Sequence, residues 1–288
     1  MKNVKIFIGF IAIFGLGLSN LVAQDFISAK DFMAELKQNK ELVVIDAGSA
    51  EDYEKRHVRG AISIPHKELY LEGEIEGLIK SPEELAKYFG DKGVSNTSAI
   101  VVYDDGSNKY SSRVFWILKY LGAENVKVLH KDMEKEWRAA RVPLTAAPAS
   151  AKAVAFTPKP NKAIIATIDE VKTGMGNPNV IIVDARAANE YNGTSENPVS
   201  KGHIKGAINI EYKEFLEDDG AFKPVDDIKA VAKKHGLDPG KEIIAYCVTS
   251  VRACPIFIAL TNAGYNNVKV YDGAYNEWVA DPKNPVEK

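Results

Sequence analysis

A cysteine and an arginine stand at the two ends of one short connection late in the chain. In the stretch IIAYCVTSVRACPIFIAL, an apolar run ends at Tyr246, Cys247 follows, and Arg252 precedes a second apolar run with helical spacing. This order predicts a strand, a turn and a helix N-terminus, where unpaired N–H groups attract anions. A thiolate at Cys247 would be stabilised there, and Arg252 would add a fixed positive charge. The sequence therefore predicts nucleophilic sulfur chemistry at this connection.

The length of the loop favours one thiol chemistry over another. The residues between Cys247 and Arg252 are Val248, Thr249, Ser250 and Val251. Phosphatases of the tyrosine type have one residue more, which makes a ring wide enough for phosphate. The smaller ring fits a sulfur atom carried on the cysteine better, and its N–H groups would bind that charged sulfur. We expect sulfur transfer, with a persulfide carrier as the first alternative and a cysteine-dependent phosphatase or arsenate reductase as a weaker one.

Two parts of the chain repeat the same order of motifs. Residues 43–69 and 180–215 each have an apolar run ending in Asp-Ala, an acidic-Tyr cluster and a His-apolar-basic-Gly-Ala-Ile motif. The parts that follow, 99–129 and 242–271, also match each other. Similarity over this length indicates a duplicated domain rather than a short solenoid repeat.

Short apolar runs alternate with segments of helical spacing in both copies. Such runs are typical of strands buried on both faces, as in a parallel sheet that helices cover. We expect strands at 42–45, 99–103, 126–129, 180–183, 242–245 and 268–271, and helices at 29–38, 82–89, 112–121, 168–173, 225–235 and 255–263. The predicted fold class is α/β, with two similar domains, each a parallel sheet flanked by helices.

Composition and alignment of the copies define the expected domains. Residues 142–163 are rich in Pro, Ala and Lys with little periodicity, and we interpret them as a linker. The first domain is then 25–141 and the second 164–288. Asp104 stands where the second copy has Cys247. Because an aspartate is not a sulfur nucleophile, we expect the first domain to be inactive and the second to be catalytic.

The N-terminal residues 1–23 have the layout of a signal peptide. Two lysines precede an apolar stretch from Ile6 to about Leu18, and small residues lead to Ala23. Cleavage after Ala23 would export the protein, to the periplasm in a Gram-negative bacterium. A retained membrane anchor is the alternative. The apolar run is short for a full span, so we expect no stable membrane insertion after cleavage.

The net charge and the absence of certain motifs in the sequence argue against several classes of function. The 288 residues carry a formal net charge of −2, without the basic excess of a nucleic-acid binder. The sequence has no His/Cys cluster with metal-ligand spacing and no nucleotide fingerprint, so we expect neither a metal nor a cofactor. Of the two cysteines, Cys254 is expected to be a small buried residue without a disulfide to Cys247. His57 and His203 recur in both copies, which indicates a structural role.

Together these motifs resemble the tandem-domain sulfurtransferases of the rhodanese family, over nearly all of residues 25–288. The residues that carry the resemblance are Asp184-Ala185-Arg186, the run from Gly202 to Asn209, Tyr246-Cys247 with its loop, and Asp272-Gly273 before Trp278. The resemblance implies that Cys247 takes a sulfane sulfur from an anionic donor, thiosulfate or 3-mercaptopyruvate, and passes it from a persulfide to a thiol or cyanide acceptor. It also implies that Arg186 faces the active loop and binds the donor.

Two residues depart from the family pattern. The family loop often has glycine where this chain has Ser250, and we expect a serine to fit only if its backbone is not left-handed. Arg252 is more typical of single-domain members, so the resemblance does not choose between thiosulfate and 3-mercaptopyruvate.

Overall fold

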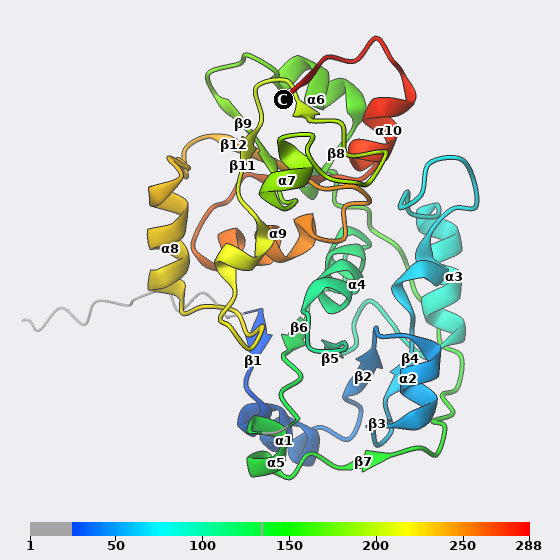
Figure 1. Cartoon of the computed structure of the whole chain (residues 1–288). Helices are drawn as coiled ribbons and strands as arrows, with labels where there is room; N and C mark the ends of the chain where they lie inside the picture. The colour runs from blue at the N-terminus through cyan, green and yellow to red at the C-terminus, as the bar shows by residue number, and fades with distance from the viewer. Residues whose placement is uncertain (1–24, 134) are drawn as a thin grey trace, which may run out of the picture.

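Two five-stranded sheets organise the chain, and the neighbouring strands within each sheet are parallel. The computed structural model describes residues 25–133 and 135–288 (Figure 1). Helices flank both sheets, so the predicted α/β class with two similar domains is confirmed. The signal peptide expected at 1–23 lies outside the described residues. Within the described ranges, no helix combines the length and apolar character that crossing a membrane requires.

The first domain has the strand order β1-β6-β5-β2-β4. Its strands are β1 (Phe26–Ile27), β2 (Val43–Asp46), β4 (Ile62–Ser63), β5 (Ile100–Tyr103) and β6 (Val126–Leu129). Its helices are α1 (Ala29–Gln38), α2 (Ala50–Lys55), α3 (Pro82–Asp91), α4 (Lys109–Tyr120) and α5 (Glu136–Ala140), with the 3₁₀ turn η1 (His66–Leu69). All four residues of β5 are buried, as its apolar sequence predicts for a central strand.

The second domain repeats this arrangement with the strand order β11-β9-β12-β13-β8. Its strands are β8 (Ile165–Ala166), β9 (Val180–Asp184), β11 (Ile208–Asn209), β12 (Glu242–Tyr246) and β13 (Val268–Tyr271). Its helices are α6 (Ile168–Gly174), α7 (Ala188–Tyr191), α8 (Val225–Lys234), α9 (Ala253–Asn262) and α10 (Ala274–Ala280), with the 3₁₀ turns η2 (Lys162–Ile164) and η3 (Tyr212–Phe215). The small antiparallel pairs are β3 (His57–Val58) with β7 (Leu144–Thr145), and β10 (His203–Ile204) with β14 (Val286–Glu287).

Side-chain caps determine where several flanking helices begin. At α3, the Ser81 hydroxyl accepts a hydrogen bond from the Glu84 N–H, and the Glu84 carboxylate accepts one from the Ser81 N–H. Thr167 and Glu170 form the same reciprocal cap at α6. Each such cap stabilises its helix by about 1 kcal/mol, so these starts are encoded locally.

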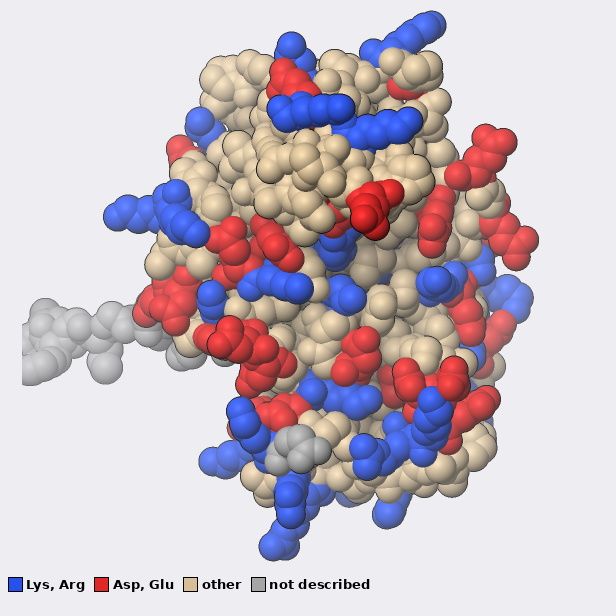
Figure 2. Space-filling view, viewed as in Figure 1, with Lys and Arg blue, Asp and Glu red and all other residues tan. Residues whose placement is uncertain are grey.

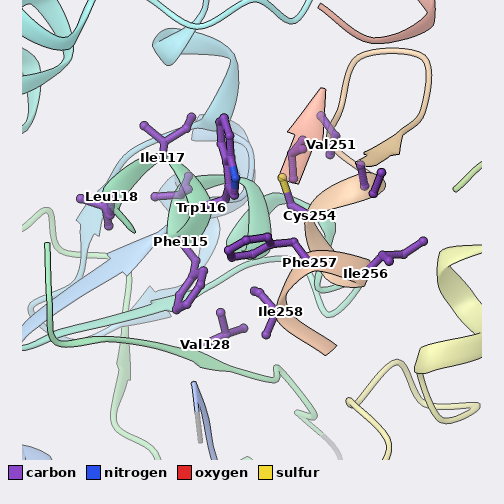
Figure 3. Close-up of a cluster of buried hydrophobic side chains, with 14 of the residues drawn as sticks. Phe115, Trp116, Ile117, Leu118, Val128, Val251, Cys254, Ile256, Phe257 and Ile258 are labelled. Carbon is purple, nitrogen blue, oxygen red and sulfur yellow. The ribbon is translucent and has the colours of Figure 1, made fainter. Parts of the chain in front are cut away.

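One apolar cluster spans both domains, and each domain has a second cluster of its own. Helices α4 and α9, one from each domain, pack against each other, and their buried side chains belong to a single cluster (Figures 1 and 3). Phe115 and Trp116 from α4 lie beside Cys254 and Phe257 from α9. Because the contact between α4 and α9 is largely apolar, it holds the domains in one relative orientation.

The segment assigned to the linker, residues 142–163, lies along the first domain. It begins with β7, which pairs with β3 of that domain. Farther on, the Val154 N–H donates to the Gly90 carbonyl at 2.9 Å. A Cβ at Gly90 would come within 2.6 Å of the Val154 carbonyl oxygen, so the close approach requires glycine. The segment is therefore bound to the domain rather than crossing freely between the two.

Candidate active site

Cys247 lies at the carboxyl end of β12, the central strand of the second sheet. Its carbonyl oxygen accepts a hydrogen bond of 2.9 Å from the Tyr275 N–H at the start of α10. In the preceding residue, the Tyr246 hydroxyl accepts one of 3.1 Å from the Ile204 N–H. The cysteine is only 1% exposed, so this end of the strand is fixed and the thiol is enclosed rather than freely accessible.

The loop after Cys247 ends on an N–H group that contacts its sulfur. The Arg252 N–H donates to the Cys247 Sγ at 3.3 Å. Helix α9 begins at Ala253, two residues before the predicted start at Pro255, which makes Arg252 the N-cap. The backbone N–H groups of residues 248–251 donate no hydrogen bond to any described residue. These donors can therefore stabilise negative charge carried on the sulfur.

Ser250 adopts the left-handed backbone that we expected a serine not to tolerate. Its φ is +59°, and its side chain is fully buried. The left-handed conformation costs a residue with a Cβ about 1–2 kcal/mol. The Ser250 hydroxyl donates to the Tyr271 carbonyl oxygen, which offsets part of that cost. The expectation was wrong because the serine side chain supplies a contact that a glycine lacks.

Arg252 forms a bidentate ion pair with Glu190 of α7. Its two terminal nitrogens lie 2.5 and 2.8 Å from the two Glu190 oxygens. Burial by itself would raise the pKa of Glu190, but the Arg252 guanidinium lowers it below its ordinary value. Sequence analysis did not identify Glu190 as a partner of the loop, although this residue lies in the acidic-Tyr cluster of the second copy. The positive charge predicted for the loop is thus already paired with a carboxylate.

Arg186 is buried against the sheet. Its Nε lies 2.9 Å from the Asp184 Oδ1, and one terminal nitrogen lies 2.6 Å from the Asp184 Oδ2. The same terminal nitrogen donates to the Gly202 carbonyl at 2.7 Å, and the guanidinium lies 4.0 Å from the centre of the Tyr275 ring. Arg186 therefore ties the segment that contains Gly202 to the end of β9. Its binding of a donor stays a prediction.

The first domain shows what the same kind of loop does with an anion. The Asp104 carboxylate, at the position of Cys247, is fully buried inside its own loop. It accepts hydrogen bonds from the N–H groups of Gly106, Asn108, Tyr110 and Ser111, at 2.9, 3.2, 3.0 and 3.1 Å. Burial raises the pKa of Asp104, and these backbone donors oppose that rise. The loop geometry therefore surrounds an acceptor group with backbone N–H donors, and the acceptor here is a side chain of the loop itself.

A segment of the first domain covers part of the loop that follows Cys247. We call residues 70–79 the roof segment; its ends, Tyr70 and Ile79, form an antiparallel bridge. A Cβ at Gly77 would come within 2.8 Å of the Thr249 carbonyl oxygen, so the roof touches the loop directly. Gly77 has a φ of +105°, which favours glycine at this contact.

A buried ion pair between the domains anchors the roof segment. Arg113 of α4 lies 2.6 Å from the Asp272 Oδ1 and donates to the Gly77 carbonyl at 2.8 Å. The second Asp272 oxygen accepts from the Ile79 N–H at 3.1 Å. Sequence analysis missed Arg113, because an arginine within an apolar helix gives no signal of its distant partner.

The remaining cysteine and the paired histidines have the structural positions expected of them. Cys254 is buried and free, and Cys247 is also free. His57 Nδ1 lies 2.6 Å from the Tyr53 carbonyl oxygen, and His203 Nδ1 lies 3.0 Å from the Tyr191 carbonyl oxygen. Each histidine also stacks on the ring of that tyrosine. The two histidines therefore make the same contacts at corresponding positions of the two domains.

Comparisons with known proteins agree with this geometry. The family model described as Rhodanese-like domain matches residues 28–140 and 167–281. Thiosulfate sulfurtransferase of Rattus norvegicus is 30% identical over 234 residues, which cover 79% of this chain and 78% of that protein. Probable 3-mercaptopyruvate sulfurtransferase of Pseudomonas aeruginosa is 31% identical over 214 residues, covering 72% and 74%. The crystal structure of the 3-mercaptopyruvate sulfotransferase SseA from Escherichia coli aligns with a TM-score of 0.78 at 27% identity, covering 87% of this chain and 98% of that one.

Proposed function

Because the chain belongs to the rhodanese family and is a sulfurtransferase, we propose that it works through a persulfide on Cys247. The donor is a small anion, thiosulfate or 3-mercaptopyruvate, as the names of the relatives suggest. The acceptor is a thiol or cyanide. The observation that carries the proposal is the contact of the Arg252 N–H with the Cys247 sulfur, in a loop whose other N–H groups stay available.

The first step moves one sulfur atom onto the cysteine. The Cys247 thiolate attacks the outer sulfur of the donor, and a new S–S bond forms. From thiosulfate, the bond between the two sulfurs breaks, and sulfite leaves with the electron pair. From 3-mercaptopyruvate, the C–S bond breaks, and the pyruvate enolate leaves and takes a proton from water. In the second step, the acceptor attacks the terminal sulfur and releases the Cys247 thiolate.

The loop lowers the energy of the intermediate. The terminal sulfur of the persulfide carries negative charge, and the N–H groups of residues 248–252 are the donors that can face it. Asp104 supports this role, because the corresponding loop of the first domain holds a carboxylate with four backbone N–H groups. Because the position of Asp104 carries no sulfur nucleophile, we assign the reaction to the second domain alone.

Turnover of thiosulfate or 3-mercaptopyruvate with cyanide tests the proposal. We expect thiocyanate to form, and we expect mass spectrometry of donor-treated protein to find one added sulfur atom on the peptide with Cys247. Cys247→Ser should abolish both signals. The matched control is Cys254→Ala, which removes the other buried thiol and should leave turnover intact. Equal turnover in Cys247→Ser would contradict the mechanism.

We also propose that the protein is exported. The support is the order of charged, apolar and small residues in 1–23. N-terminal sequencing of protein recovered from a periplasmic extract should find Gln24 as the first residue. A chain without residues 1–23 should stay in the cytoplasmic fraction. Recovery of the full chain from the membrane fraction would instead support the retained anchor.

A further inference from the structure

Arg252 follows the loop of Cys247 and carries a positive charge that interacts with the Cys247 sulfur, so this charge also acts on a donor that reaches the sulfur. Its backbone N–H contacts the Cys247 sulfur at 3.3 Å. Burial acts to lower the pKa of Arg252, but Glu190 and the Cys247 sulfur raise it above its ordinary value. The guanidinium therefore keeps its charge next to the place where an anionic donor must dock.

Glu190 occupies the face of that guanidinium that would bind an anion. A bidentate arginine–carboxylate pair uses the same fork of N–H groups that binds a sulfonate or carboxylate ligand. Both side chains are largely enclosed, at 24% exposed for Arg252 and 14% for Glu190. A largely enclosed pair is screened less by solvent than a surface pair, so the two charges cancel locally.

The other groups around the loop do not restore a positive charge. Arg186 is paired with Asp184 through its Nε and one terminal nitrogen, and its other terminal nitrogen is buried without a hydrogen-bond partner among the described residues. The roof segment, which touches Thr249, exposes the acidic residues Glu72, Glu74 and Glu76. On the molecular face in Figure 2, positive and negative side chains are interspersed. The two arginines that the sequence assigns to donor binding are thus both neutralised by carboxylates.

We propose that Glu190 determines which donor this enzyme uses, by cancelling the charge of Arg252 and so favouring a monoanion over a dianion. Thiosulfate is a dianion, and it must approach a cysteine that is itself a thiolate. A monoanionic donor such as 3-mercaptopyruvate brings one negative charge fewer into a partly buried site, where uncompensated charge is costly. This inference rests on the proposed persulfide chemistry of Cys247, and it assigns Glu190 as a specificity-determining residue.

Glu190→Gln tests the inference, because it keeps the size of the side chain and releases the guanidinium from its ion pair. We expect kcat/KM for thiosulfate to rise about tenfold, since the freed arginine can form a charge-assisted hydrogen bond with the dianion. For 3-mercaptopyruvate we expect a change of less than about threefold. The ratio of the two kcat/KM values is the readout, because a general loss of folded protein lowers both alike.

The matched control is Glu214→Gln. This variant removes one carboxylate from the same domain and changes the net charge by the same amount. The Glu214 carboxylate lies 2.9 Å from Lys234 Nζ and 2.8 Å from His235 Nε2. The donor ratio should stay at its wild-type value in this variant. A rise in the ratio in both variants would assign the effect to overall charge and overturn the role of Glu190.

The salt dependence of the reaction gives a second test. With Arg252 neutralised, kcat/KM for thiosulfate in the wild-type enzyme should change little as salt is added, whereas in Glu190→Gln it should fall steeply. An unchanged donor ratio in Glu190→Gln, or a steep salt dependence in the wild type, overturns the inference but leaves the persulfide mechanism in place. Failure of both donors to load Cys247 in the wild type would instead overturn the proposed function.

Discussion

Replacing Arg113 by methionine removes the charge that joins the roof segment to the second domain. The Arg113 side chain is 0% exposed, and that of Asp272 is 8% exposed. In Arg113→Met, the Asp272 carboxylate stays buried, and its remaining described partner is the Ile79 N–H at 3.1 Å. Removing one partner of a buried ion pair costs about 3–5 kcal/mol, because the other charge is left uncompensated.

This cost is large against the total stability of a protein, which is about 5–15 kcal/mol. We expect urea unfolding of Arg113→Met, followed by tryptophan fluorescence, to show a free energy of unfolding lower by about 3–5 kcal/mol. Loading of Cys247 should also slow, because the hydrogen bond from Arg113 to the Gly77 carbonyl, which holds the roof on Thr249, is lost.

A second substitution separates the ion pair from the loss of arginine packing. Arg113→Met/Asp272→Asn removes both charges and keeps an oxygen for the Ile79 N–H, so it should recover at least half of the lost stability. Lys127→Met is the control, because its pair with Glu35 is partly exposed, at 31% and 22%, and should contribute less than about 1 kcal/mol. A cost below about 1 kcal/mol for Arg113→Met, or additive costs in the double variant, would refute the reasoning.

Three further predictions concern the two loops and His66 of η1. Ser250→Ala loses the hydrogen bond to the Tyr271 carbonyl and keeps a Cβ on a left-handed backbone, whereas Ser250→Gly loses the bond but relieves the strain. The urea midpoint of Ser250→Ala should therefore lie below that of Ser250→Gly. Equal midpoints would show that the backbone angle carries no strain. Burial, helped by Arg113, lowers the pKa of His66 from 6.5 to about 4. The unfolded chain therefore binds a proton that the folded chain excludes, and stability falls by about 3 kcal/mol as pH drops through this window. His66→Phe should remove that part of the loss between pH 7 and pH 4, and an identical loss in both proteins would contradict the assignment. Asp104→Ala leaves the buried N–H groups of Asn108 and Ser111 without an acceptor and should lower the free energy of unfolding by at least about 2 kcal/mol, whereas Asp104→Asn, which keeps one oxygen, should lower it less.

The features that follow from local pattern were predictable. The apolar runs gave the buried strands, and the position of Cys247 after β12 followed from the end of its run. The start of α9 was placed two residues late, at Pro255 instead of Ala253, because proline is tolerated throughout the first helical turn and does not fix its first residue.

The contacts that tune the site were not predictable, because they join residues far apart in the sequence. Arg252 and Glu190 are 62 positions apart, and Arg113 and Asp272 are 159 apart. Spacing within one helix or strand carries no information about such pairs. The sequence therefore located the arginine of the loop but not the carboxylate that neutralises it.

The close attachment of residues 142–163 to the first domain also bears on assembly. Near its end, the Lys159 N–H donates to the Leu121 carbonyl at 2.8 Å and the Asn161 N–H to the Tyr120 carbonyl at 2.7 Å. Exchange of whole domains between two copies of a protein requires the connecting segment to detach and extend. Here the open state through which such an exchange passes would lose these bonds and expose the apolar interface of α4 and α9. The attachment of the segment therefore raises the barrier to exchange of domains between two copies.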